Sequence, residues 1–135
     1  MVTVHANKLT GLLEATGLFA AEQVQSLLLE QKQSGKSITD VAVGMGYVEE
    51  ELFLEALAKA MSVPYIKVSD LTIEDEVLEK LPTKVVFQYN VIPVAIENGY
   101  LRVATHDPFM PGIMDALRLA SGKRIQFALS STQDL

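Results

Sequence analysis

Three short segments of the sequence carry residue types that could do chemistry. Gly35-Lys36-Ser37 has the ending of a phosphate-binding loop, His106-Asp107 joins an imidazole to a carboxylate, and Glu49-Glu50-Glu51 offers three carboxylates in a row. Such residues would serve nucleotide binding, acid–base catalysis and metal binding, respectively. Each segment has to meet the spacing that its chemistry requires.

The first two segments do not meet it. A phosphate-binding loop needs a glycine five residues before Gly35, where this chain has Glu30, and a carboxylate would repel the phosphates. Gly35 is expected to end a helix instead, with Lys36 in solvent. Adjacent residues in an extended segment point to opposite sides, so His106 and Asp107 are expected to be turn residues at the end of a strand.

The glutamate run and the missing cysteines argue against a reactive site. Glu49-Glu50-Glu51 is expected at the start of a helix, where acids interact favourably with the helix dipole and neighbouring side chains do not converge on a metal. Without cysteine, the chain has no disulfide, no thiolate nucleophile and no cysteine-based metal site. We therefore predict no catalytic residue, metal site or cofactor, and no enzymatic activity of this chain.

Composition narrows the class of partner. The 135 residues are 49% hydrophobic and 21% charged, which is typical of a globular chain. Seventeen acidic and 11 basic side chains give a net charge of -6, which disfavours nucleic acid and docking on an anionic membrane. No apolar run approaches the roughly 18 residues that span a bilayer, and a signal peptide is not recognisable. The sequence predicts a cytoplasmic protein without direct membrane insertion.

Residues 1–62 are predicted to form a helical repeat subdomain. Gly17-Leu18-Phe19 and Gly46-Tyr47-Val48 each follow a short apolar helix and precede an acid-led amphipathic helix. Both glycines stand where a left-handed residue would end the short helix. Two such hairpins would pack as four helices. The last helix would bury a stripe formed by Leu52, Phe53, Ala56, Leu57 and Ala60.

Residues 63–135 are predicted to form a small α/β subdomain with a three- or four-stranded sheet, so that the whole chain is α+β. Asn98-Gly99 between two apolar runs predicts a β-hairpin. Residues 130–134 resemble the start of a further helix, which indicates a piece of a longer protein. The expected strands are 64–68, 91–96, 100–105 and 124–129, and the expected helices are 70–81, 83–88 and 111–120.

These motifs, taken in order, resemble the N-terminal region of the ATPases that drive type II secretion and type IV pilus assembly. One copy of a repeated motif runs from Lys8 to Gln31 and a second from Ser37 to Ala60. Val63-Pro64-Tyr65 and Asp107-Pro108 continue the resemblance in the second half. It covers nearly the whole chain.

The resemblance implies a docking and regulatory domain of a bacterial secretion or pilus machine. Its implied partners are the inner-membrane platform proteins and an ATPase domain in the same polypeptide, so the domain would lie in the cytoplasm, peripheral to the inner membrane. One alternative implied by the resemblance is a cyclic-di-GMP receptor. Another is a regulatory module attached to an unrelated bacterial signalling protein.

For the cyclic-di-GMP alternative, the resemblance implies a ligand held by both motifs. The family motif leads with arginine, which is Lys8 in the first copy and Ser37 in the second. Lysine lacks the planar guanidinium fork and serine lacks the charge, so we expect these motifs to serve as scaffold. If the nucleotide does bind, the implied residues are Lys8, Leu9, Thr10, Leu13, Gly17, Gln31, Ile38, Thr39 and Gly46.

One apolar pair is a candidate partner surface. Phe109 and Met110 lie between Pro108 and Pro111, in a segment expected to be a loop. Exposed apolar pairs of this kind mark binding sites for other proteins. We therefore expect Phe109 and Met110 at the surface.

Overall fold

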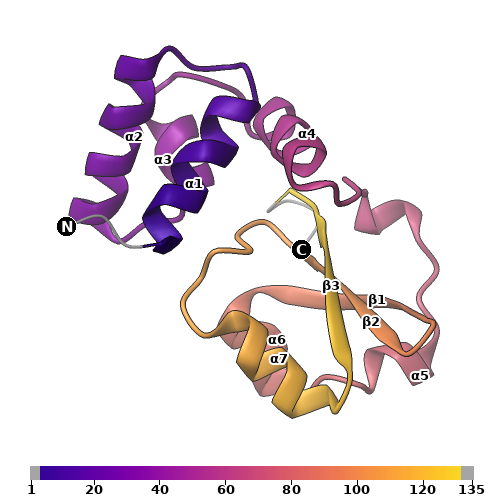
Figure 1. Ribbon diagram of the computed structural model, residues 1–135. Coiled ribbons are helices and arrows are strands. Elements are labelled where there is room, and N and C mark those ends of the chain that lie inside the picture. Colours follow the sequence, from indigo (N-terminus) through magenta and orange to yellow (C-terminus); the bar gives the residue numbers. More distant parts are fainter. Residues whose placement is uncertain (1–3, 132–135) are drawn as a thin grey trace. The chain divides into compact units, whose positions relative to one another are not determined.

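The computed structural model describes the backbone of residues 4–131 and the side chains of residues 9–131. The chain divides into two compact units, Met1–Val63 and Pro64–Leu135 (Figure 1). The first unit contains helices, and the second combines short helices with a three-stranded sheet. The predicted α+β class is confirmed.

Four helices make up the first unit. They are α1 (Val4–Ala15), α2 (Ala21–Ser34), α3 (Ile38–Gly44) and α4 (Glu50–Met61). Each helix packs on the next in sequence, and α4 also packs on α1. The four helices therefore close around one core, as the two predicted hairpins required.

The turns between the paired helices are made by glycine. Gly17 follows α1 with φ 71° and Gly46 follows α3 with φ 76°, both in the left-handed region. The predicted helix ends at these two glycines are confirmed. Because most side chains are strained in this conformation, the two turns favour glycine, which has no Cβ.

The buried face of α4 differs from the predicted stripe. Phe53, Leu54 and Leu57 are fully buried and Ala58 nearly so, whereas Leu52 is 52% exposed. The predicted positions Ala56 and Ala60 are only half-buried. Apolar residues at most positions from 52 to 58 satisfy the helical period in two orientations, and the pattern alone did not choose between them.

The sheet of the second unit contains β1 (Val91–Glu97), β2 (Tyr100–Thr105) and β3 (Arg124–Leu129), in the order β1-β2-β3. β1 and β2 are antiparallel and are joined by Asn98 and Gly99, whose φ values are 50° and 81°. Positive φ at both central residues is the geometry of a type I′ hairpin turn. The predicted hairpin is confirmed, and so is the strand at 124–129.

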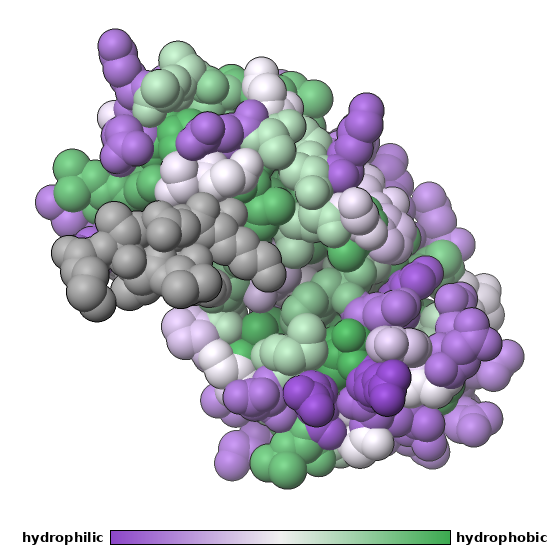
Figure 2. All heavy atoms as spheres, in the orientation of Figure 1, coloured by the Kyte–Doolittle hydropathy of each residue, from purple (hydrophilic) through white to green (hydrophobic). Residues whose placement is uncertain are grey.

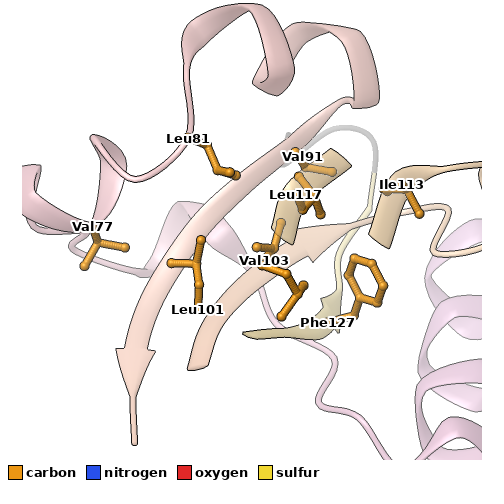
Figure 3. Close-up of a cluster of buried hydrophobic side chains, with 9 residues drawn as sticks. Val77, Leu81, Val91, Leu101, Val103, Ile113, Leu117 and Phe127 are labelled. Carbon is orange, nitrogen blue, oxygen red and sulfur yellow. The ribbon is translucent and has the colours of Figure 1, made fainter. Parts of the chain in front are cut away.

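A helix crosses from β2 to β3, which run parallel. This helix, α7 (Ile113–Ser121), packs on β3, and α6 (Thr83–Tyr89) packs on β1 and on α7. In Figure 3, side chains from the helices and strands point toward one another to form the core of the unit. Its buried members are Val77, Leu81, Val91, Leu101, Val103, Ile113, Leu117, Ile125 and Phe127.

Three predicted elements of this unit need correction. Residues 64–68 form no strand but make a single bridge, Tyr65 to Leu129, because Pro64 has no N–H to extend the ladder. The helix expected at 70–81 is reduced to α5 (Asp75–Leu78), after a 3-10 turn η1 (Val68–Asp70) and an extended stretch. α7 begins two residues later than predicted, since Gly112 precedes it with φ 76°.

The helix start expected at residues 130–134 falls mostly outside the described residues. Ser130 and Ser131, which the structure describes, are neither helix nor strand. Ser130 is buried, and its backbone N–H donates a hydrogen bond of 3.0 Å to the carbonyl of Thr105. This bond continues the pairing of β3 with β2 by one residue.

The orientation of α4 can be tested with two neighbouring leucines. Leu54→Ala removes a fully buried side chain, and we expect it to lower the free energy of unfolding by about 2–5 kcal/mol. Leu52→Ala alters an exposed position of the same helix and should cost less than about 1 kcal/mol. Urea denaturation followed by circular dichroism measures both. Equal losses would contradict the observed orientation.

Candidate functional site

The structure places the paired-motif residues in two different environments. Leu9, Leu13, Ile38 and Thr39 are buried in the helical unit. Gly17 and Gly46 are exposed, and Thr10 and Gln31 are half-buried. The side chain of Lys8 lies outside the described residues. The apolar positions of the motif and Thr39 thus lie in the core, whereas the two glycines are exposed.

The two glycine turns lie at the same end of the helical unit. Phe19, just after the first turn, and Tyr47, in the second, have ring centroids 6.4 Å apart. Phe19 also contacts the buried Phe53 at 5.9 Å. Aromatic pairs at these distances attract each other beyond their burial of area. The repeat therefore brings Gly17 and Gly46 together through the aromatic residues beside them.

Gln31 lies at the opposite end of this unit. It stands ten residues after the start of α2, which corresponds to roughly 15 Å of helix. Because α2 begins beside the Gly17 turn, Gln31 and the two glycine turns do not converge. A ligand touching all of them would have to extend along the unit.

Ser37 has a structural role that sequence reasoning did not assign. Its hydroxyl accepts a hydrogen bond of 3.1 Å from the backbone N–H of Asp40 and so caps the N-terminus of α3. Ser37 occupies the place where the resemblance expects an arginine. A serine followed by a short apolar helix is the usual N-cap signal, so the sequence did contain the information.

The segments that could have done chemistry are used for turns and helix ends. Gly35 ends α2 with φ 72°, and Lys36 is exposed, which confirms both expectations. The backbone N–H of Asp107 donates to Thr105 Oγ1, and Asp107 Oδ1 accepts from the N–H of Phe109, both at 3.1 Å. These bonds confirm a turn after β2, although the sequence did not predict that His106 and Asp107 would be buried.

The glutamate run also lies where it was expected. Glu49 precedes α4, and Glu50 and Glu51 form its first turn, near the positive end of the helix dipole. Among the described side chains, those of residues 9–131, no three histidine, aspartate or glutamate residues are grouped as metal ligands. No helix within residues 4–131 is long and apolar enough to cross a bilayer.

The candidate partner surface at Phe109 and Met110 is less open than predicted. Both residues are half-buried, and Met110 packs against the core of the second unit. The most exposed large apolar side chains among the described residues are Leu119 on α7 and Phe87 on α6, at 89% and 79%. The sequence analysis did not predict these two exposed side chains. A signal for Phe87 was present, because four of the seven residues of α6 are apolar and cannot all face one core.

Solved structures share this fold over nearly the whole chain. A structure of MshE with cdg matches with a TM-score of 0.77 and 23% identity, covering 93% of this chain and 91% of that chain. The N-terminal domain of XpsE matches with a TM-score of 0.68 and 23% identity, covering 99% and 93%. The chain therefore has the fold of MshE and of the N-terminal domain of XpsE.

Residues 61–135 match the MshEN domain family, and the chain belongs to this family. It is 28% identical over 126 residues to the type IV pilus assembly ATPase PilB of Myxococcus xanthus (strain DK1622), covering 93% of this chain and 22% of the relative. The PilB of Thermus thermophilus is 26% identical over 110 residues, covering 80% and 12%. These findings confirm the resemblance, and the chain spans about a fifth or less of these ATPases.

A third relative carries a different name. Bacteriophage adsorption protein B of Escherichia coli (strain K12) is 22% identical over 108 residues, covering 80% of this chain and 14% of the relative. Similar segments therefore occur both in pilus ATPases and in a protein named for phage adsorption.

The capping role of Ser37 predicts a selective response to substitution. Ser37→Ala should lower the free energy of unfolding by about 1 kcal/mol, whereas Ser37→Asp keeps a capping oxygen and should leave stability nearly unchanged. Urea denaturation gives the stability, and amide hydrogen exchange at Asp40 reports on the cap itself. Similar losses for alanine and aspartate would show that the hydroxyl does not act as a cap.

Proposed function

We propose that this chain is the docking and regulatory domain of a type IV pilus assembly or type II secretion ATPase, with no catalytic role of its own. One observation carries the proposal: the match to PilB of Myxococcus xanthus covers 93% of this chain but only 22% of the ATPase. ATP hydrolysis would then belong to the remaining part of the polypeptide. The partners of this domain would be the platform proteins of the inner membrane.

The uses of the residues in the structure support this proposal. Gly35, Asp107 and Glu49, which stood in segments suggestive of chemistry, are engaged in a helix end, a turn and a helix start. The helical repeat is held together by side chains buried inside it, including Leu13 and Leu27. A domain built in this way presents surfaces to other proteins, and ATP chemistry needs groups supplied elsewhere.

Docking can be tested with purified components. The chain would be titrated with cytoplasmic segments of the platform proteins of its own machine, and binding measured by calorimetry. We expect saturable binding to one segment, because a docking domain must recognise its platform before it can transmit motion. Segments from an unrelated secretion machine serve as the control. Absence of binding to every segment of the cognate platform would refute the docking role.

A second candidate function is binding of cyclic-di-GMP, which the structural likeness to MshE with cdg favours. The chain differs from the implied motif at the positions that would face the nucleotide. Ser37 replaces a guanidinium and is engaged in capping α3, and Lys8 lacks a planar fork. Leu9 and Ile38 are buried, so the bases could not stack on them without rearrangement.

Calorimetry with cyclic-di-GMP distinguishes the two functions. We expect no saturable heat at micromolar ligand, because the arginines of the motif are missing. Micromolar binding that Gln31→Ala abolishes would instead establish the nucleotide receptor. Gln33→Ala is the matched control, since Gln33 is an exposed glutamine in the same turn of α2.

A further inference from the structure

Helix α7 has an outer face that the fold of the second unit does not use. Its inner face buries Ile113 and Leu117 against the sheet. The exposed residues are Met114, Asp115, Arg118 and Leu119. The spacing of these four, at i, i+1, i+4 and i+5, places them along one side of the helix.

The apolar members of this face stay accessible in the folded unit, Met114 at 38% and Leu119 at 89%. A single exposed leucine is ordinary, but Leu119 is 89% exposed and shares the side of α7 with the exposed Met114. The neighbouring helix α6 adds Phe87, which is 79% exposed. In Figure 2, the lower part of the molecule, where Figure 1 places α7, shows hydrophobic atoms among hydrophilic ones. Large exposed apolar side chains on two helices that pack on each other indicate a surface that another molecule covers.

The order of residues on this face is self-complementary. From Met114 to Leu119 the residue types follow the same order from either end: an apolar residue, a charged residue, two residues of the inner side, a charged residue and an apolar residue. The two charged residues, Asp115 and Arg118, have opposite signs. When two copies of α7 pack antiparallel about an axis between residues 116 and 117, Asp115 of each copy faces Arg118 of the other. Met114 then faces Leu119 twice. Contacts repeated in this way are the property of an isologous, two-fold interface.

The two charges are available for such contacts. Among the described residues, neither Asp115 nor Arg118 makes an ion pair within the chain, although they are three residues apart on one helix. An acid on the face also disfavours an anionic membrane as the occupant, as does the net charge of -6. A second copy of the chain satisfies both the acid and the base.

We propose that the outer face of α7 is the interface of a homodimer, in which two antiparallel α7 helices exchange Asp115–Arg118 ion pairs and bury Leu119 against Met114. This goes beyond the proposed function, since the docking role requires no contact between copies. Two helices of nine residues each bury less surface than the roughly 1,200 Å² of stable complexes, so the dimer is weak. It forms where copies are concentrated or held together.

Sedimentation equilibrium of the whole chain from micromolar to millimolar concentration tests the interface. We expect the unaltered chain to dimerise. Asp115→Arg should abolish dimerisation because two arginines then face two arginines. Arg118→Asp should abolish it as well, because two aspartates then face two aspartates. An equal mixture of the two variants should associate again, since every clash becomes an ion pair. Leu119→Ser should weaken dimerisation roughly tenfold. Leu29→Ser, at a leucine of α2 that is 58% exposed, is the matched control and should leave it unchanged.

Other outcomes would contradict the homodimer. One is an unaltered chain that remains monomeric at millimolar concentration. Another is a mixture of the two charge variants that stays monomeric although circular dichroism shows both variants to be folded. Association that survives Asp115→Arg would place the contact elsewhere. If the chain instead sediments with vesicles of phosphatidylglycerol and Leu119→Ser releases it, the face binds membrane and the homodimer is wrong.

Discussion

The helical unit depends on two backbone positions that must be left-handed. Gly17 and Gly46 end the first helix of each hairpin, with φ of 71° and 76°. An added Cβ would meet no atom within 4 Å at either position, so the constraint comes from the local backbone and not from packing. For a residue with a side chain this conformation costs about 1–2 kcal/mol. Because the chain reverses here, Phe19 and Tyr47 meet and fix the two hairpins to each other.

Structure set by neighbouring residues could be predicted from the sequence. The Asn98-Gly99 turn and the helix end at Gly35 follow from the few residue types that tolerate positive φ. The strand at 124–129 was predicted from its alternation, which holds from Arg124 to Phe127 and ends there, since Ala128 and Leu129 are also buried. In these cases a local rule and the tertiary structure agree, and the local rule is sufficient.

Structure that depends on a choice between equal local solutions could not be predicted. Leu52 and Leu54 both fit an apolar stripe on α4, and only the packing of the other helices buries Leu54. The stretch around Tyr65 has the composition of a strand, yet its pairing with Leu129 stops after one bridge because Pro64 cannot donate. The same holds for Leu119, since its exposure follows from which side of α7 packs on the sheet. The exposed apolar face of α7 was therefore visible only in three dimensions.

The buried positions and the surface positions of the repeated motif are under different physical constraints. Leu9, Leu13 and Ile38 are buried, so a polar side chain at any of them would disrupt the core of the helical unit. Position 37 lies outside the core, and its serine contributes to stability through the cap that it forms on α3. The TM-score of 0.77 at 23% identity shows that the fold is shared although most residues differ. Positions outside the core can differ between chains that share this fold, so the fold by itself does not determine which ligand or partner a chain binds.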